Sequence, residues 1–195
     1  MRKRISFLLF VLLVVSMIFA GCSKGDQEKT PQNNNPPAAE QEEKDAADLQ
    51  PEEEIDYVLF LKHKDKPYIL DEAYSVKKSD ERLKGISIEE FVVRELIGFE
   101  DFQAYVNPIP KGTKLLSLKK ENQKVVVDLS KEFVSGQKGT SNDTLLSIGS
   151  IVNSLTVLEG IEEVEILVEG KPVEKLNGID MTHPFGYMEG LYPDK

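Results

Sequence analysis

Apolar and polar positions divide the chain into three parts. Residues 6–19 form an almost unbroken apolar run, and residues 23–54 are almost entirely polar. From Ile55 onward, apolar residues recur at the spacings typical of strands and helices. This last part, about 130 residues, has the size of a single domain and contains no internal repeat. We expect one folded domain over residues 55–182 and a tail over residues 183–195.

Three pairs of short apolar runs predict β-hairpins, each with a polar turn between its two strands. Pro172 places the last of these strands at a sheet edge, because proline has no N–H for a central ladder. The paired runs are residues 55–61 with 68–76, residues 115–119 with 125–129, and residues 164–168 with 171–176.

Two further stretches have helical spacing. Ser87 and Glu90 form a capping-box pattern that predicts a helix over residues 88–97, ending near Gly98. Residues 140–143 open a second predicted helix, with apolar positions 145, 148, 151, 152 and 155 on one face and a stop at Gly160. The resulting order ββαββαββ predicts an α/β (α+β) sandwich, with a mixed β-sheet covered by two helices.

The beginning of the chain predicts export. Basic residues precede an apolar run that is shorter than the ~20 residues needed to cross a bilayer, which indicates a cleavable signal over residues 1–21. Phe19-Ala20-Gly21-Cys22 resembles the lipobox of bacterial lipoproteins, and this resemblance implies lipid modification (palmitate) of Cys22. The alternative is an ordinary signal peptide that happens to contain a cysteine. Two or more acyl chains anchor firmly, whereas a single chain binds reversibly.

Residues 22–54 predict a flexible, extended tether, because a segment rich in Pro, Asn and Glu cannot bury enough apolar surface to fold. The net charge of −10 excludes nucleic acid as a partner, since its binding requires clustered Lys and Arg. The same charge repels anionic lipid. Residence at the extracytoplasmic face of the bacterial cell membrane would therefore depend on the lipid anchor at Cys22.

No motif predicts an active site, a cofactor or a metal centre. The two histidines, His63 and His183, lack ligand spacing and are expected in exposed loops. Residues 136–141 carry glycines and a lysine before a helix, where anions can bind, although an ordinary loop and cap is the simpler interpretation. Asp128 is more simply interpreted as the cap of a turn than as a catalytic carboxylate. A solvated face is likewise the simpler interpretation of four further carboxylates, Glu159, Glu162, Glu163 and Glu165.

Six segments carry a pattern in their order and spacing: residues 87–96, 109–113, 127–130, 151–155, 160–161 and 166–170. Taken in this order, they look like the GerMN domain of sporulation and spore germination. Gly98-Phe99 departs from the Gly-Pro that this family often has. The resemblance runs from about Ile55 to Thr182 and implies structural positions, with Asp128 and Ser130 closing the central hairpin. It also implies a non-enzymatic role in sporulation, germination or cell-envelope assembly.

Three functions stay open. The first is a lipid-anchored interaction domain that docks envelope proteins or further copies of itself, as the ring-building modules that the GerMN family resembles do. The second is a binding module for cell-wall glycan or a small solute. It would need aromatic platforms, for which the candidates are Tyr57, Tyr68, Tyr74 and Tyr105. The third is an envelope hydrolase, which would need a cleft that gathers the histidines or carboxylates.

Overall fold

The computed structural model describes residues 52–192. The predicted signal, Cys22 and nearly all of the predicted tether lie outside this range. Within residues 52–192, no helix is both long and apolar enough to cross a membrane.

The predicted first hairpin is confirmed. β1 (Glu54–His63) and β2 (Ile69–Lys77) pair antiparallel along their whole length. β1 buries Leu59, Phe60 and Leu61 in succession, so neither of its faces is left entirely to solvent. The short strand β3 (Tyr105–Val106) pairs with the end of β1 and completes a three-stranded sheet in the order β2-β1-β3.

The predicted mixed sheet is formed by the later strands. It contains β4 (Leu115–Glu121), β5 (Lys124–Leu129), β6 (Glu163–Val168) and the two-residue edge strand β7 (Lys171–Pro172), in that order. β5 and β6 are parallel, and the other pairs are antiparallel. Val125, Val127 and Leu129 are fully buried at alternate positions of β5, because one face of this sheet packs on the helices.

The two predicted helices are confirmed as α2 (Ile88–Gly98) and α4 (Ser141–Thr156). The Ser87 hydroxyl caps α2, but the Glu90 carboxylate pairs with Arg94, so only half of the predicted capping box forms. Thr140 and Asp143 make a complete capping box on α4. This helix ends at Thr156, before the predicted stop, and Gly160 (φ +75°) lies in the turn that follows.

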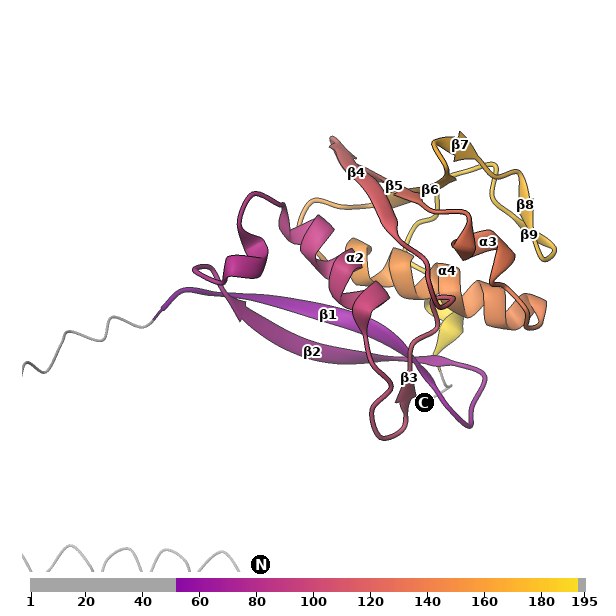
Figure 1. Cartoon of the computed structure of the whole chain (residues 1–195), viewed down its shortest axis with the longest axis horizontal. Helices are drawn as coiled ribbons and strands as arrows, with labels where there is room; N and C mark the ends of the chain where they lie inside the picture. Colours follow the sequence, from indigo (N-terminus) through magenta and orange to yellow (C-terminus); the bar gives the residue numbers. More distant parts are fainter. Residues whose placement is uncertain (1–51, 193–195) are drawn as a thin grey trace, which may run out of the picture. The chain divides into compact units, whose positions relative to one another are not determined.

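The helices lie between the two sheets (Figure 1). α4 contacts β1, β6 and α2, so it is buried almost all round rather than on one apolar face. The side of α4 opposite its apolar face carries small polar residues, which are also buried and mostly hydrogen-bonded. The Phe60 amide, for example, donates to Ser154 Oγ at 3.0 Å along the part of β1 that β3 does not reach. The predicted sandwich is thus confirmed, and the first hairpin adds a separate sheet to it.

Short elements interrupt the predicted order. The last predicted strand, residues 171–176, pairs with β6 only as far as Pro172, so the prediction is wrong for the residues after it. The chain leaves β6 there, and β8 pairs with β9 in a separate hairpin. The proline supplies no N–H for further pairing, and φ is positive at Asn177 and Gly178, which turn the chain between β8 and β9. The short elements are η1 (Glu81–Leu83), α3 (Glu132–Ser135), β8 (Lys175–Leu176), β9 (Ile179–Asp180) and η2 (Glu189–Leu191).

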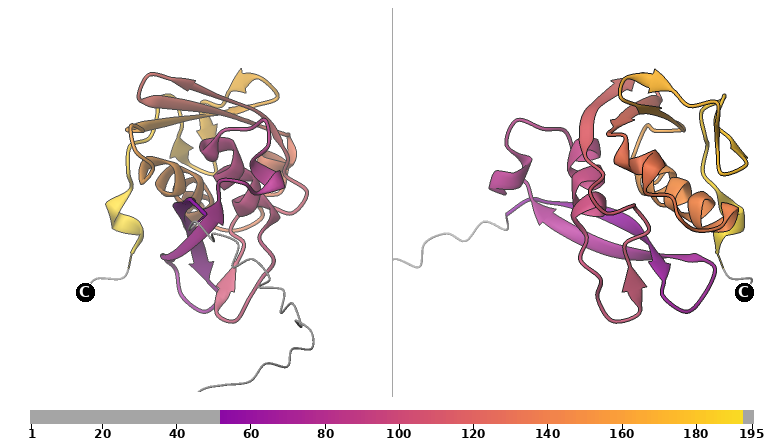
Figure 2. Two further views of the ribbon diagram at one scale, coloured as in Figure 1. Left: turned by 90° about the vertical axis from the view of Figure 1, so that its left-hand side faces the viewer. Right: turned by 45° about the vertical axis from the view of Figure 1, so that its right-hand side comes forward.

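The C-terminal segment, residues 183–192, packs on the domain. It runs along the outer side of α4 (Figure 2, left view). Phe185 exchanges two backbone hydrogen bonds with Val164 of β6, at 2.8 and 2.9 Å. Further on, the buried side chain of Asn153 holds Met188, and Leu191 is only 6% exposed beside Gly149. This segment therefore belongs to the folded domain.

Candidate binding surface

The two histidines each form a local contact with a different neighbour in the sequence. His63 Nδ1 accepts a hydrogen bond from the Asp65 amide at 3.1 Å, and His183 Nδ1 lies 2.8 Å from Thr182 Oγ1. Residues 52–192 contain no group of three or more His, Cys, Asp and Glu side chains placed to hold a metal ion. Within the described residues, neither histidine therefore belongs to a cluster of potential metal ligands.

The predicted carboxylates have structural contacts. Asp128 Oδ1 accepts from the Gly170 amide at 2.8 Å and so holds the turn between β6 and β7. Ser130 Oγ accepts from the Lys114 amide at 3.0 Å and closes the β4–β5 pair. Ser130 thus takes the place that the family resemblance implied, whereas Asp128 secures the next turn. Glu165 pairs with Lys124 at 2.9 Å, Glu162 contacts Gln123, and Glu159 and Glu163 are exposed.

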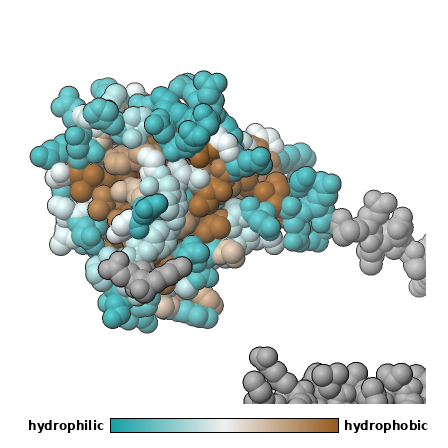
Figure 3. All heavy atoms as spheres, turned by 180° about the vertical axis from the view of Figure 1, so that it is seen from behind, coloured by the Kyte–Doolittle hydropathy of each residue, from teal (hydrophilic) through white to brown (hydrophobic). Residues whose placement is uncertain are grey.

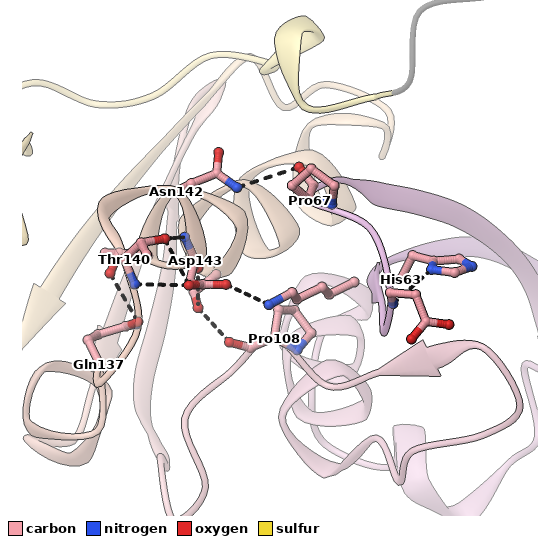
Figure 4. A network of polar contacts seen from close by, with 11 residues as sticks. His63, Pro67, Pro108, Gln137, Thr140, Asn142 and Asp143 are labelled. Carbon is pink, nitrogen blue, oxygen red and sulfur yellow. Dashed lines mark hydrogen bonds and ion pairs between the residues drawn. The ribbon is translucent and has the colours of Figure 1, made fainter.

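The predicted anion loop borders a polar hollow of about 940 Å³. Asp143 lies at its wall, where Oδ1 contacts Lys62 Nζ at 2.6 Å and Oδ2 accepts from the Thr140 amide at 2.9 Å (Figure 4). The hydrogen bond from Lys62, followed by those from Thr140, lowers the pKa of Asp143 to about 2. The capping box therefore satisfies the amides of Thr140 and Asp143 within the protein. The lining charges also balance, because Lys62, Lys111 and Lys138 face Glu100, Asp101 and Asp143.

The four candidate tyrosines do not form one platform. Tyr57 belongs to the core, where it stacks on Tyr74 at 5.5 Å and meets Phe91 edge-on at 5.4 Å. Burial, with Glu95 nearby, raises the pKa of Tyr57 to about 12. Tyr68 packs against His63. The hydroxyl of Tyr105 forms a hydrogen bond with Glu72, and this bond raises the pKa of Tyr105 to about 12. Among these four side chains Tyr74 is the most exposed, at 37%, whereas Tyr68 and Tyr105 are half-buried and Tyr57 is buried.

An apolar groove is the feature that the sequence pattern did not predict. A hollow of about 740 Å³ lies where β1, β2, the end of α4 and the C-terminal segment meet, and a second of about 560 Å³ adjoins it through Val58 and Val157. The face opposite to that of Figure 1 carries apolar side chains over its middle and polar ones around its margin (Figure 3). We define the apolar groove by the residues that line these two hollows: Asp56, Tyr57, Val58, Phe60, Leu70, Asp71, Ala73, Tyr74, Ser75, Val157, Leu158, Tyr187, Glu189 and Tyr192.

Three aromatic rings form one end of the groove. Phe60 meets Tyr192 edge-on at 5.6 Å and Tyr187 at 6.1 Å, and the two tyrosines stack with their hydroxyl oxygens 2.6 Å apart. Burial, together with the hydrogen bond to Tyr187, raises the pKa of the Tyr192 hydroxyl. The aromatic residues at positions 185–192 were the one signal in the sequence that could have pointed to this groove. They follow no helical or strand periodicity, so the sequence did not indicate where they would pack.

Comparisons with known proteins agree with this fold. Residues 58–174 match the sequence profile of the Germane family, described as sporulation and spore germination. No protein with a curated description matches significantly.

Three solved structures are similar to the chain. The tandem GerMN domains of the sporulation protein GerM from Bacillus subtilis share 18% identity at a TM-score of 0.53, covering 75% of this chain and 50% of theirs. The first GerMN domain of GerM shares 17% identity at a TM-score of 0.49, over 68% and 97% of the two chains. A candidate lipoprotein from Clostridium perfringens shares 25% identity at a TM-score of 0.47, over 68% and 87%. The family profile matches more than half of the residues, and the chain therefore belongs to the Germane family of sporulation and spore germination domains.

Proposed function

We propose that this protein is an extracytoplasmic lipoprotein, anchored through Cys22, whose Germane domain docks envelope proteins during sporulation or spore germination. In this proposal the domain has no catalytic role. Residues 1–21 are the signal, residues 22–54 the tether, and the working domain extends from residue 55 through the C-terminal segment.

One observation carries the docking role. Exposed large apolar side chains gather along the apolar groove, where Tyr74 is 37%, Val157 44% and Tyr187 44% exposed. Gathered apolar exposure of this kind is a mark of interaction sites, whereas isolated exposed side chains are ordinary. The candidate catalytic groups, in contrast, lie in separate structural contacts.

The anchoring role is supported by the basic and apolar start of the chain, by Gly21-Cys22 and by the acidic composition. A strongly acidic domain gains nothing from an anionic membrane surface, so a covalent lipid is the anchor that the chemistry favours. The tether would let the domain reach partners at some distance from the bilayer.

The test is a Cys22→Ala variant in the host cell, with Ser23→Ala as the matched control. After a high-salt wash, we expect the Cys22→Ala protein in the soluble fraction and the control in the membrane fraction, with equal thermal stability. A Cys22→Ala protein that stays with the membranes would contradict lipid anchoring.

The docking role is tested separately. A photo-cross-linking side chain placed at position 74 of the groove should capture an envelope protein in sporulating cells, and the capture should be lost when Val157→Lys is also present. Sedimentation with purified peptidoglycan separates this function from glycan binding. Co-sedimentation that persists at high salt would favour the glycan-binding function.

A further inference from the structure

We propose that the apolar groove binds a basic amphipathic segment of a partner protein, with the apolar side chains of that segment in the hollows and its Lys or Arg side chains beside Asp71, Glu189 and Asp56. This inference rests on the docking role proposed above and adds the chemistry of the partner.

The first argument is the sign of the charges. Every side chain of the groove that is charged at neutral pH is acidic, and no Lys, Arg or His is among the lining residues. The polar hollow near the other end of α4, beside Gly139 and Asp143, differs, because three lysines balance three carboxylates there. The groove therefore presents an uncompensated negative potential next to apolar surface, which attracts cations that carry apolar parts.

The second argument is that these carboxylates are not engaged within the domain. In the part of the chain that the structure describes, Asp56, Asp71 and Glu189 take part in no ion pair within 4 Å. Many other carboxylates of the domain do, among them Glu89, Glu90, Glu95 and Glu165. The groove thus keeps carboxylates available for a partner's cations.

The third argument is the aromatic end of the groove. Tyr187 is 44% exposed and Tyr192 is half-buried, and both line the same hollow as Asp71 and Glu189, with the buried ring of Phe60 behind them. A Lys or Arg side chain whose stem lies on aromatic rings gains both apolar contact and cation–π attraction. Tyrosines with two rotatable bonds also lose little entropy on binding.

The groove is held in shape before any partner arrives. Asn153 is fully buried. Its Oδ1 accepts from the Met188 amide at 2.8 Å and its Nδ2 donates to the Met188 carbonyl at 3.2 Å. Leu191 fills the space beside Gly149. A surface that needs no ordering on binding loses less free energy when a partner docks.

Other occupants fit the charge less well. Nucleic acid and anionic lipid would meet like charge. A second copy of this chain would bring a second set of carboxylates against the first, because an isologous contact places the same patch on both sides. A neutral glycan could stack on the tyrosines, but it would make no use of the carboxylates.

The experiment uses the chain from residue 22 onward with Cys22→Ala. The probe is a fluorescent peptide of alternating Lys and Leu, and two control peptides replace Lys by Glu or Leu by Ser. Binding is measured by fluorescence anisotropy at low and physiological salt. We expect the Lys–Leu peptide to bind and both control peptides to bind at least about tenfold more weakly, because apolar and cationic contacts are both required.

Charge-matched variants locate the site. Asp71→Asn with Glu189→Gln should weaken binding of the Lys–Leu peptide about tenfold, at about two- to fivefold per carboxylate. Glu163→Gln with Glu174→Gln removes the same charge from exposed positions outside the groove and should change the affinity less than twofold. Tyr187→Ala should also weaken binding. Urea unfolding midpoints verify that each variant is folded.

Several outcomes would overturn the inference. Equal weakening by the two charge-matched pairs would mean that the peptide senses only the overall charge of the domain. Failure of the Lys–Leu peptide to bind would exclude a basic amphipathic partner. A dimer in sedimentation that Val157→Lys dissociates would assign the groove to self-association. Peptidoglycan binding that Tyr187→Ala weakens and Asp71→Asn does not would assign it to glycan. The proposed function is judged separately, by the Cys22→Ala fractionation and the capture in cells.

Discussion

Gly149 and Leu191 provide the sharpest test of the packing of the C-terminal segment. Gly149 lies inside α4, and a Cβ built on it would stand 2.0 Å from Leu191 Cδ1 and 3.5 Å from Leu191 Cγ. Leu191 is 6% exposed, so it cannot move outward without losing contacts. Gly149→Ala should therefore force Leu191 partly out of its place.

The magnitude follows from two opposing terms. Replacing an interior helix glycine by alanine stabilises a helix by about 1 kcal/mol. Partly expelling a buried leucine costs about 2 kcal/mol, within the range for burying such a side chain. We therefore expect Gly149→Ala to destabilise the protein by about 1 kcal/mol. Leu191→Ala alone should cost about 2–3 kcal/mol.

In the Leu191→Ala background, the effect of Gly149→Ala on the free energy of unfolding should change sign. Once Leu191 is alanine, the new methyl group at position 149 no longer clashes and makes only an ordinary van der Waals contact with Ile69 Cδ1 at 3.7 Å, so the helix-propensity gain is left. Gly149→Ala should then stabilise the Leu191→Ala protein by about 1 kcal/mol. Urea unfolding of the four proteins in the double-mutant cycle measures both effects. If Gly149→Ala has the same sign in both backgrounds, Leu191 is not seated against α4 and the described packing is refuted.

Three further predictions follow from contacts described above. Asn153→Ala should cost about 2–3 kcal/mol, because it removes a fully buried side chain and leaves the partly buried N–H and C=O of Met188 without their partner, and amide exchange at Met188 should quicken. The Lys62–Asp143 pair stabilises the folded state above the ordinary pKa of Asp143, 3.8, and this contribution is lost as the pH falls toward about 2. Since both side chains are partly exposed, Lys62→Met should cost about 0.5–1 kcal/mol at pH 7, and urea midpoints should show that cost vanishing between pH 4 and pH 2. Gly170→Ala should cost about 1 kcal/mol in thermal unfolding because φ is +73° there, whereas the control Gly98→Ala, with open space around its Cβ, should be neutral or slightly stabilising.

Local signals in the sequence were sufficient for the long elements. Ser87 and Thr140 cap the two helices that they predicted, and the runs around residues 115–129 form the central hairpin. These features depend on neighbours within a few residues. They can therefore be predicted without knowing where the rest of the chain lies.

Features that depend on distant contacts could not be predicted in this way. Ser147, Ser154 and Asn153 are polar and were not placed in the core, yet each is buried because a distant backbone group supplies its hydrogen bond. The apolar groove combines β1, β2, the end of α4 and the last residues, so no local pattern contains it. The prediction for Cys22 concerns residues outside the described range and awaits its own test.

The meeting of the first strand with the last residues also constrains how the protein is made. Phe60 is synthesised at the beginning of the domain and must wait for Tyr192 before its aromatic cluster can close. Contacts between distant parts of a chain slow folding, because a large loop has to be closed first. A nascent chain therefore leaves one wall of the apolar groove missing until residue 192 has been made. Only molecules that include residues 183–192 present the complete surface.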